Sequence, residues 1–158
     1  MRTEELAAAV LRKLSECGLT LATAESCTGG LIGKLLTDIP GSSAVYVGGV
    51  ISYVNDVKRR LLGVSEETLR AYTAVSRQTA VEMAKGTREA TRAGIGVSVT
   101  GLAGPDGDGT GRPIGLVYIA MDMEHFSFNK ELHLSGSRAQ IREDAARAVF
   151  EMLLDSLN

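Results

Sequence analysis

The chain has 158 residues, 44% of them hydrophobic and 23% charged, which is typical of one globular domain. Its formal net charge of -2 gives no electrostatic reason to expect nucleic acid or an anionic membrane surface as a partner. No apolar run reaches the roughly 18 residues that cross a bilayer, and the N-terminus lacks the apolar segment of a signal peptide. We therefore expect a soluble cytoplasmic protein.

Alternating helix and strand patterns fill the first half of the chain. A helix that begins after Thr3, its expected cap, ends at Gly18. The elements expected next are a buried strand over 19–24, a helix to about residue 38, a valine-rich strand over 44–53 and a short helix from 55 to about 63.

The second half of the chain continues this alternation. Ser65 and Ser76 are expected to cap a short helix and a long helix that runs to about residue 93. The β-branched segment 95–100 predicts a strand covered on both faces. Further expected elements are strands over 115–121 and 126–134, a hairpin turn at 122–124 and a last helix after Ser137. Together they predict a single α/β domain over residues 1–158, with a mixed sheet between layers of helices.

The cysteines, Cys17 and Cys27, form no CxxC pair and no cluster with histidine. They argue against a disulfide framework and a structural zinc site and fit a reducing compartment. We expect no metal site.

The first candidate site is the segment 24–30, Ala-Glu-Ser-Cys-Thr-Gly-Gly, where a strand leads directly into a helix. Such a turn places Ser26 at the carboxyl end of a strand, where open α/β sheets bind ligands. The N–H groups of Thr28, Gly29 and Gly30 would then face an anion or a developing oxyanion. A serine that only caps the helix, with glycines for tight packing, is the alternative.

A serine nucleophile needs a base, and the histidines, His125 and His133, lie near or within the late hairpin. Lys58, where another strand gives way to a helix, is the natural candidate. It must be neutral to accept a proton, and burial or a nearby cation would lower its pKa from about 10.4. Tyr53 could donate to the same site or relay protons there. A solvated lysine and a packing tyrosine are the alternative.

Cys27 is a second candidate nucleophile, because a cysteine at the start of a helix has a lowered pKa. Catalysis by cysteine normally needs a partnering base, and no histidine lies nearby in the sequence. We favour the interpretation that Cys27 is a small, buried apolar side chain.

The segment from Gly101 to Pro113 contains five glycines and two prolines and has no apolar periodicity. It follows Thr100 at a strand end, and its length favours a functional loop. Glycines let the backbone approach a ligand, and successive N–H groups can hold phosphate, although the Walker A pattern is missing. A flexible surface loop is the alternative.

Arg138 and Arg142 lie four residues apart on one face near the start of the last helix. Positive charge there opposes the helix dipole, which is easier to understand if the arginines bind phosphate or carboxylate. Pairing with Glu143, Asp144 or another neighbouring acid is the alternative.

These segments together resemble the CinA C-terminal domain family, the nicotinamide-nucleotide amidohydrolases. The matching segments are Ala24–Leu31, the set Tyr53, Asn55 and Lys58, then Ala74–Ser76, Ser98–Gly107 and Gly136–Arg142. Their order and spacing cover nearly the whole chain. In many members this domain follows a larger N-terminal domain. In this sequence the matching segments already begin at Ala24, so we expect a stand-alone version.

The resemblance implies a three-layer α/β/α domain that converts nicotinamide mononucleotide to nicotinate mononucleotide and ammonia, without a metal or other cofactor. It also implies a homo-oligomer. By motif position Ser26 resembles the nucleophile, Lys58 the base and Tyr53 the accompanying hydroxyl. An amidase of another small phosphorylated metabolite and a non-catalytic nucleotide-binding module linked to competence or DNA damage are the alternatives.

The same resemblance suggests substrate contacts. Thr100 resembles one such contact, and Arg142 resembles an arginine near the substrate. The residues expected to bind substrate are Thr28, Gly29, Gly30, Thr100, Gly101, Gly104, Arg138 and Arg142. Members often carry a lysine where Arg112 stands, so phosphate affinity could differ if that position touches the substrate.

Overall fold

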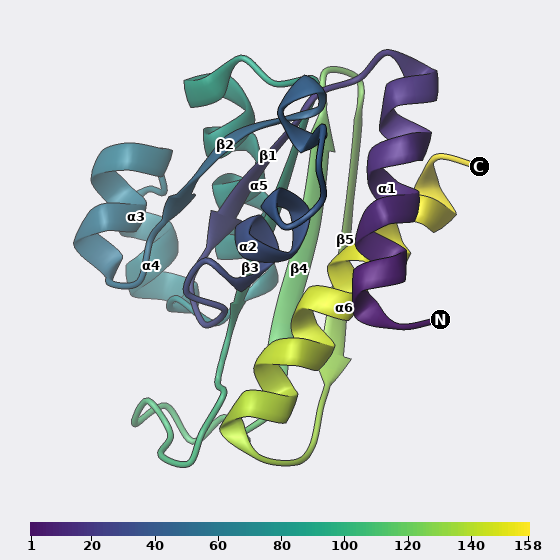
Figure 1. Ribbon diagram of the computed structural model, residues 1–158. Coiled ribbons are helices and arrows are strands. Elements are labelled where there is room, and N and C mark those ends of the chain that lie inside the picture. Colours follow the sequence, from purple (N-terminus) through teal and green to yellow (C-terminus); the bar gives the residue numbers. More distant parts are fainter.

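The centre of the fold is a five-stranded sheet with the strand order β2-β1-β3-β4-β5 (Figure 1). The computed structural model describes residues 1–158. The strands are β1 (Leu21–Glu25), β2 (Tyr46–Ile51), β3 (Ile95–Gly101), β4 (Leu116–Met123) and β5 (Phe126–His133). Strand β1 pairs in parallel with β2 and β3, whereas β4 is antiparallel to both of its neighbours. The expected mixed sheet is therefore confirmed.

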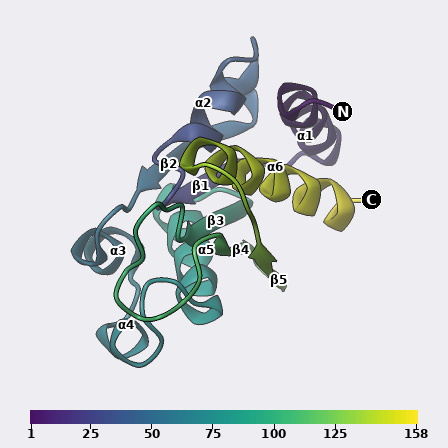
Figure 2. The same ribbon diagram turned by 90° about the horizontal axis from the view of Figure 1, so that it is seen from below.

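Helices cover both faces of this sheet (Figures 1 and 2). The helices are α1 (Thr3–Cys17), α2 (Leu31–Thr37), α3 (Asn55–Leu62), α4 (Glu66–Tyr72), α5 (Arg77–Thr91) and α6 (Arg138–Ser156). Helices α1, α2 and α6 form one layer, and α3, α4 and α5 form the other. This confirms the three-layer α/β/α architecture. None of these helices is long and apolar enough to cross a membrane.

Burial explains why β1 and β3 lie in the middle of the sheet. Every residue of β1 is buried, and so are the first six residues of β3. Their apolar side chains join a core cluster that includes Leu14 of α1 and Phe150 of α6. The β-branched composition of residues 95–100 therefore indicated a doubly covered strand correctly.

The element boundaries follow from local chemistry. Ser65 and Ser76 cap α4 and α5 as predicted, because their hydroxyls accept hydrogen bonds from the N–H groups of Thr68 and Thr79. Thr3 is not the cap of α1. The cap position belongs to Arg2, whose N–H donates to Glu5 at 2.7 Å.

Two further boundaries differ from the expectation. Strand β2 starts two residues later, because residues 42–44 form a turn of 3-10 helix. The hairpin between β4 and β5 turns at Glu124 and His125, so Asp122 and Met123 still belong to β4. Asp122 accepts a 2.6 Å ion-pair bond from Arg88 of α5, which holds the end of β4 against that helix.

The parallel strands determine where the functional groups meet. Because β2, β1 and β3 run in the same direction, their carboxyl ends lie at one edge of the sheet. The connections that leave this edge carry Ser26, the segment 52–58 and the glycine-rich loop after Gly101. Open α/β sheets bind ligands at such an edge.

Candidate active site

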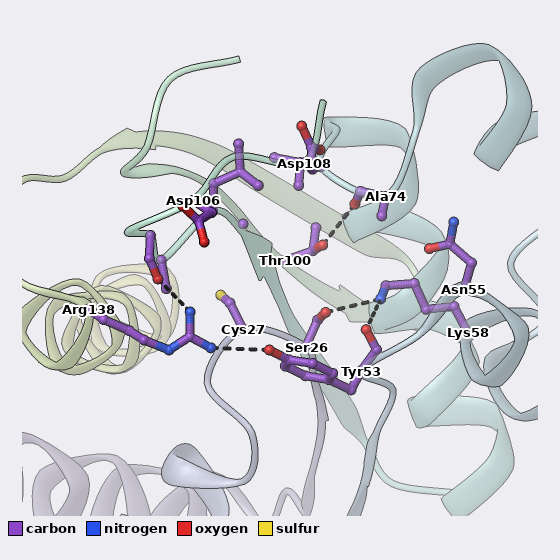
Figure 3. A pocket seen from close by; sticks show the side chains of 15 residues that line it. Ser26, Cys27, Tyr53, Asn55, Lys58, Ala74, Thr100, Asp106, Asp108 and Arg138 are labelled. Carbon is purple, nitrogen blue, oxygen red and sulfur yellow. Dashed lines mark hydrogen bonds between the residues drawn. The ribbon is translucent and has the colours of Figure 1, made fainter. Parts of the chain in front are cut away.

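A cavity of about 270 Å³ opens at the carboxyl edge of the parallel strands (Figure 3). Its lining comes from the β1–α2 turn, the β2–α3 connection, the segment before α5, the glycine-rich loop and the start of α6. The expected site residues that line it are Ser26, Tyr53, Lys58, Thr100, Gly101, Gly104 and Arg138. Most of the site expected from the sequence therefore converges on one cavity.

Ser26 is held by the backbone of the central strands. Its N–H donates to the Val99 carbonyl at 3.1 Å, which extends the pairing of β1 with β3 by one residue. The carbonyl of Glu25 accepts the N–H of Ser52 at 2.7 Å. Ser26 is 8% exposed, so its hydroxyl is largely shielded from solvent at the cavity floor.

Lys58 lies on α3, and its side chain is almost fully buried, with 1% exposed. Its Nζ atom lies 3.0 Å from Ser26 Oγ and 2.7 Å from the Ser52 carbonyl oxygen, and both contacts are hydrogen bonds. A third, longer contact of 3.5 Å reaches the Tyr53 carbonyl. Burial lowers the pKa of Lys58 from 10.5 to about 8, because all three partners are uncharged and the ammonium loses its hydration.

This geometry suits a neutral amine. A neutral lysine has two N–H bonds, which the carbonyls of Ser52 and Tyr53 can accept, and one lone pair. The ammonium form donates to Ser26 Oγ, whereas in the neutral form the lone pair is left to accept the hydroxyl proton of Ser26 across the same 3.0 Å contact. The solvated-lysine alternative is thus wrong for Lys58.

Tyr53 contributes its carbonyl, rather than its hydroxyl, to the surroundings of Lys58. The side chain is 58% exposed, and its hydroxyl oxygen accepts a 3.1 Å bond from Arg138. Arg138 also donates to the Gly104 carbonyl at 2.6 Å (Figure 3). The Tyr53 phenol and Arg138 therefore connect the β2–α3 segment to the glycine-rich loop at the cavity mouth.

The remaining expected residues on the cavity wall have structural constraints of their own. Thr100 Oγ1 donates to the Ala74 carbonyl at 2.7 Å, so towards a ligand this hydroxyl can only accept. Gly101 has no room for a side chain, because an added Cβ would lie 2.5 Å from Val117 and 2.8 Å from the Leu116 carbonyl. Two carboxylates not expected from the sequence, Asp106 and Asp108, lie on the loop across the cavity from Ser26 (Figure 3).

Glu25 is the residue that the sequence interpretation missed. Its carboxylate is buried and accepts hydrogen bonds from four donors in and before the first turn of α2. The donors are Thr28 Oγ1 at 2.8 Å, Gly30 N at 3.2 Å, Ile32 N at 2.9 Å and Gly33 N at 3.0 Å. The signal was an acid at the end of a strand whose following turn leads into a helix, because the dipole at a helix start favours negative charge.

This carboxylate corrects the expected anion site. The N–H of Gly30 already donates to Glu25, and the N–H of Gly29 donates to the Ser26 carbonyl at 3.0 Å. Neither group is free for an anion in the cavity. Thr28, Gly29, Gly30 and Arg142 are all absent from the cavity lining.

The two other arginines bind the protein itself. Arg142 donates from Nε to the Cys27 carbonyl at 3.0 Å and from Nη2 to the Thr28 carbonyl at 2.9 Å. Arg112 donates to Thr73 Oγ1 at 2.7 Å and to the Tyr72 carbonyl at 3.1 Å. Arg112 thereby ties the glycine-rich loop to the end of α4 and does not line the cavity.

Cys27 lines the cavity next to Ser26 but is 6% exposed. Burial raises the pKa of its thiol to about 11, so the thiolate is scarce at neutral pH. This fits the interpretation of Cys27 as a small apolar side chain. No group of three or more His, Cys, Asp and Glu side chains is placed to hold a metal ion.

The chain was compared with known proteins. It is 46% identical over 150 residues to a CinA-like protein of Gemmatimonas aurantiaca. That alignment covers 95% of this chain and 35% of the relative. The crystal structure of the competence/damage inducible protein CihA from Agrobacterium tumefaciens superposes with a TM-score of 0.93 at 45% identity, covering 99% of this chain and 95% of that one.

A second solved structure, the competence damage-inducible protein A from Klebsiella pneumoniae, superposes with a TM-score of 0.97 at 34% identity, covering 99% of this chain and 98% of that one. The chain spans about a third of the length of the curated relatives that it matches (35–36%). The family model of the CinA C-terminal domain matches residues 3–157. The chain therefore belongs to the CinA C-terminal domain family.

Proposed function

We propose that the chain hydrolyses the carboxamide of nicotinamide mononucleotide to nicotinate mononucleotide and ammonia, with Ser26 as nucleophile and Lys58 as base. The contact that carries this proposal is the 3.0 Å hydrogen bond between Lys58 Nζ and Ser26 Oγ. It lies at the floor of a cavity sized for a small molecule, and Lys58 has a lowered pKa. A nucleophile beside a buried base is the arrangement that acyl transfer needs.

In the first half-reaction Lys58 Nζ takes the Ser26 proton as the Ser26 oxygen forms a bond to the carboxamide carbon. The carbonyl oxygen of the substrate becomes an oxyanion. Lys58 then returns the proton to the amide nitrogen, the carbon–nitrogen bond breaks, and ammonia leaves. The product of this step is an ester of Ser26 with the nicotinate group.

The second half-reaction reverses these roles with water. Lys58 accepts a proton from the attacking water, whose oxygen bonds to the ester carbon. The bond from that carbon to Ser26 Oγ breaks, and the proton returns to Ser26. The carbonyls of Ser52 and Tyr53 keep the Lys58 amine oriented throughout both steps.

The choice of substrate rests on the family resemblance, and one charged side chain of the cavity, Arg138, supports it. Arg138 stands at the mouth and has N–H groups beyond those that bind Tyr53 and Gly104. It is the arginine suited to the substrate phosphate. Binding of this remote group would orient the amide against Ser26.

An ammonia-release assay tests the proposal. Nicotinamide mononucleotide is compared with nicotinamide and nicotinamide riboside, each with and without a chelator. We expect release from the mononucleotide that is unaffected by the chelator and lost in Ser26→Ala and Lys58→Ala. Ser98→Ala is the matched control, because Ser98 is a buried serine on β3 that bonds the Ala80 carbonyl away from the cavity. Native turnover by Ser26→Ala would refute the proposal.

A further inference from the structure

Some backbone N–H groups around Ser26 make hydrogen bonds within the chain, and others do not. Buried N–H groups are nearly always hydrogen-bonded, so an unpaired one calls for an explanation. The N–H groups of Ser26, Gly29 and Gly30 donate to Val99, Ser26 and Glu25 respectively. The N–H groups of Cys27 and Thr28 donate to no other residue, although both residues are buried.

The directions of these two free groups are fixed by the carbonyls that share their peptide planes. In a trans peptide the N–H points opposite to the C=O of the preceding residue. The Ser26 carbonyl accepts the Gly29 N–H at 3.0 Å, which sets the direction of the Cys27 N–H. The Cys27 carbonyl accepts Arg142 Nε at 3.0 Å, which sets the direction of the Thr28 N–H.

From these contacts we infer that the N–H groups of Cys27 and Thr28 form the oxyanion hole, and that Arg142 is a positioning residue that aims them. Arg142 reaches the turn from α6 and, like Thr28, is outside the cavity lining, whereas Ser26 and Cys27 line the cavity. The Thr28 N–H can therefore meet an oxyanion only at the floor of the cavity, beside the Cys27 backbone. The Thr28 N–H therefore points away from the guanidinium. Arg142 also polarises the Cys27–Thr28 peptide, which strengthens its N–H as a donor.

The glycine that follows fits this role. Gly29 has a φ of +59°, and a Cβ added there would lie 3.2 Å from Arg142 Nη2. A side chain at this position would strain the backbone and crowd the guanidinium against the Thr28 carbonyl, which it contacts at 2.9 Å. The turn therefore keeps Arg142 within reach of both carbonyls.

This inference rests on the proposed function and predicts which kinetic constant changes. Donors aimed at an oxyanion act in the transition state, whereas a substrate-binding arginine acts in the ground state as well. For Arg142→Ala we expect kcat for ammonia release to fall about 10-fold to 100-fold. The Kd of nicotinamide mononucleotide, measured in the Ser26→Ala background, should change less than about twofold. Arg142→Lys should regain part of kcat, because one donor can still reach the Cys27 carbonyl.

The matched control is Arg147→Ala, which removes an arginine of the same helix that pairs with Glu151 on the surface. It should leave kcat and Kd unchanged. If Arg142→Ala instead raises Kd as much as it lowers kcat/KM, Arg142 contacts the substrate and the inference is wrong. An unchanged kcat in Arg142→Ala would also overturn it.

A second probe separates this inference from the choice of substrate. A fluorophosphonate forms a bond from Ser26 Oγ to phosphorus, fluoride leaves, Lys58 takes the proton, and negative charge develops on the phosphoryl oxygen. Slower labelling of Arg142→Ala than of wild type and Arg147→Ala supports the inference even if the mononucleotide is not hydrolysed. Equal labelling rates, or no labelling of wild type, would overturn it.

Discussion

Lys58 Nζ and Ser26 Oγ are 3.0 Å apart, although 32 positions separate the two residues in the chain. Each follows a parallel strand of the same sheet, Ser26 directly after β1 and Lys58 in the helix after β2. The sheet brings their connections to one edge, and burial among carbonyls prepares the lysine to accept a proton.

The proposed activity should depend on pH through Lys58. Its pKa of about 8 means that the ammonium form prevails at pH 7 and the neutral base at pH 9. We therefore expect kcat/KM for ammonia release to rise with pH and to level off above an apparent pKa near 8. Lys34→Met, which changes an exposed lysine, should leave the profile unchanged. A rate independent of pH between 6 and 9 would contradict the role of Lys58.

Lys58→Met should be inactive but stable. The folded state holds the Lys58 proton less tightly than the unfolded chain does, so below about pH 8 wild type carries a destabilising buried charge. The lowering of the Lys58 pKa from 10.5 to about 8 corresponds to a cost of about 3 kcal/mol in the unfolding free energy of wild type. Lys58→Met removes this cost but also loses the hydrogen bond to the Ser52 carbonyl, which offsets about 1 kcal/mol of the gain.

The stability difference should itself depend on pH. At pH 7 we expect Lys58→Met to exceed wild type by about 1–2 kcal/mol in unfolding free energy. The difference should shrink between pH 8 and 10, because wild type is relieved of its charge there. Urea denaturation at several pH values measures this, and a difference that grows with pH would show that Lys58 is not destabilised by burial.

Cys27 should be dispensable and unreactive. With a pKa near 11 and 6% exposure, its thiol should resist iodoacetamide at pH 7, whereas the exposed Cys17 should react. Cys27→Ala should keep kcat within about threefold of wild type. Mass spectrometry of alkylated peptides and the ammonia assay check both points. Acyl transfer trapped on Cys27 would reassign the nucleophile.

The Ser26–Lys58 pair could be predicted because its signals are local. Each residue stands at a strand-to-helix junction, and parallel strands bring such junctions together. Both histidines lie in the later hairpin, far from Ser26 in the sequence, so a lysine was the candidate base that remained. The layers and most helix starts followed in the same way from apolar periodicity and from capping serines such as Ser65 and Ser76.

The partners of the backbone amides could not be predicted. The sequence shows that each residue other than proline has a backbone N–H donor, but it does not show which acceptor that donor meets, because the acceptor depends on tertiary structure. Arg142 reaches the carbonyl of Cys27 across 115 positions, and no local pattern announces that contact. Arg142 and Gly30 were therefore interpreted as ligand contacts, although in the structure both make bonds within the protein.

Glu25 should matter for both stability and rate. Four donors converge on its buried carboxylate, and Glu25→Gln would place an amide NH2 against one of them, such as the N–H of Gly33. We expect Glu25→Gln to lower the unfolding free energy by about 1–3 kcal/mol and to lower kcat, because the turn after Ser26 loses part of its support. Glu89→Gln, an exposed change on α5, is the matched control and should alter neither. Urea denaturation and the ammonia assay at one pH report the two effects separately. If Glu25→Gln matches wild type in both, the hydrogen bonds of this carboxylate do not hold the nucleophile turn in place.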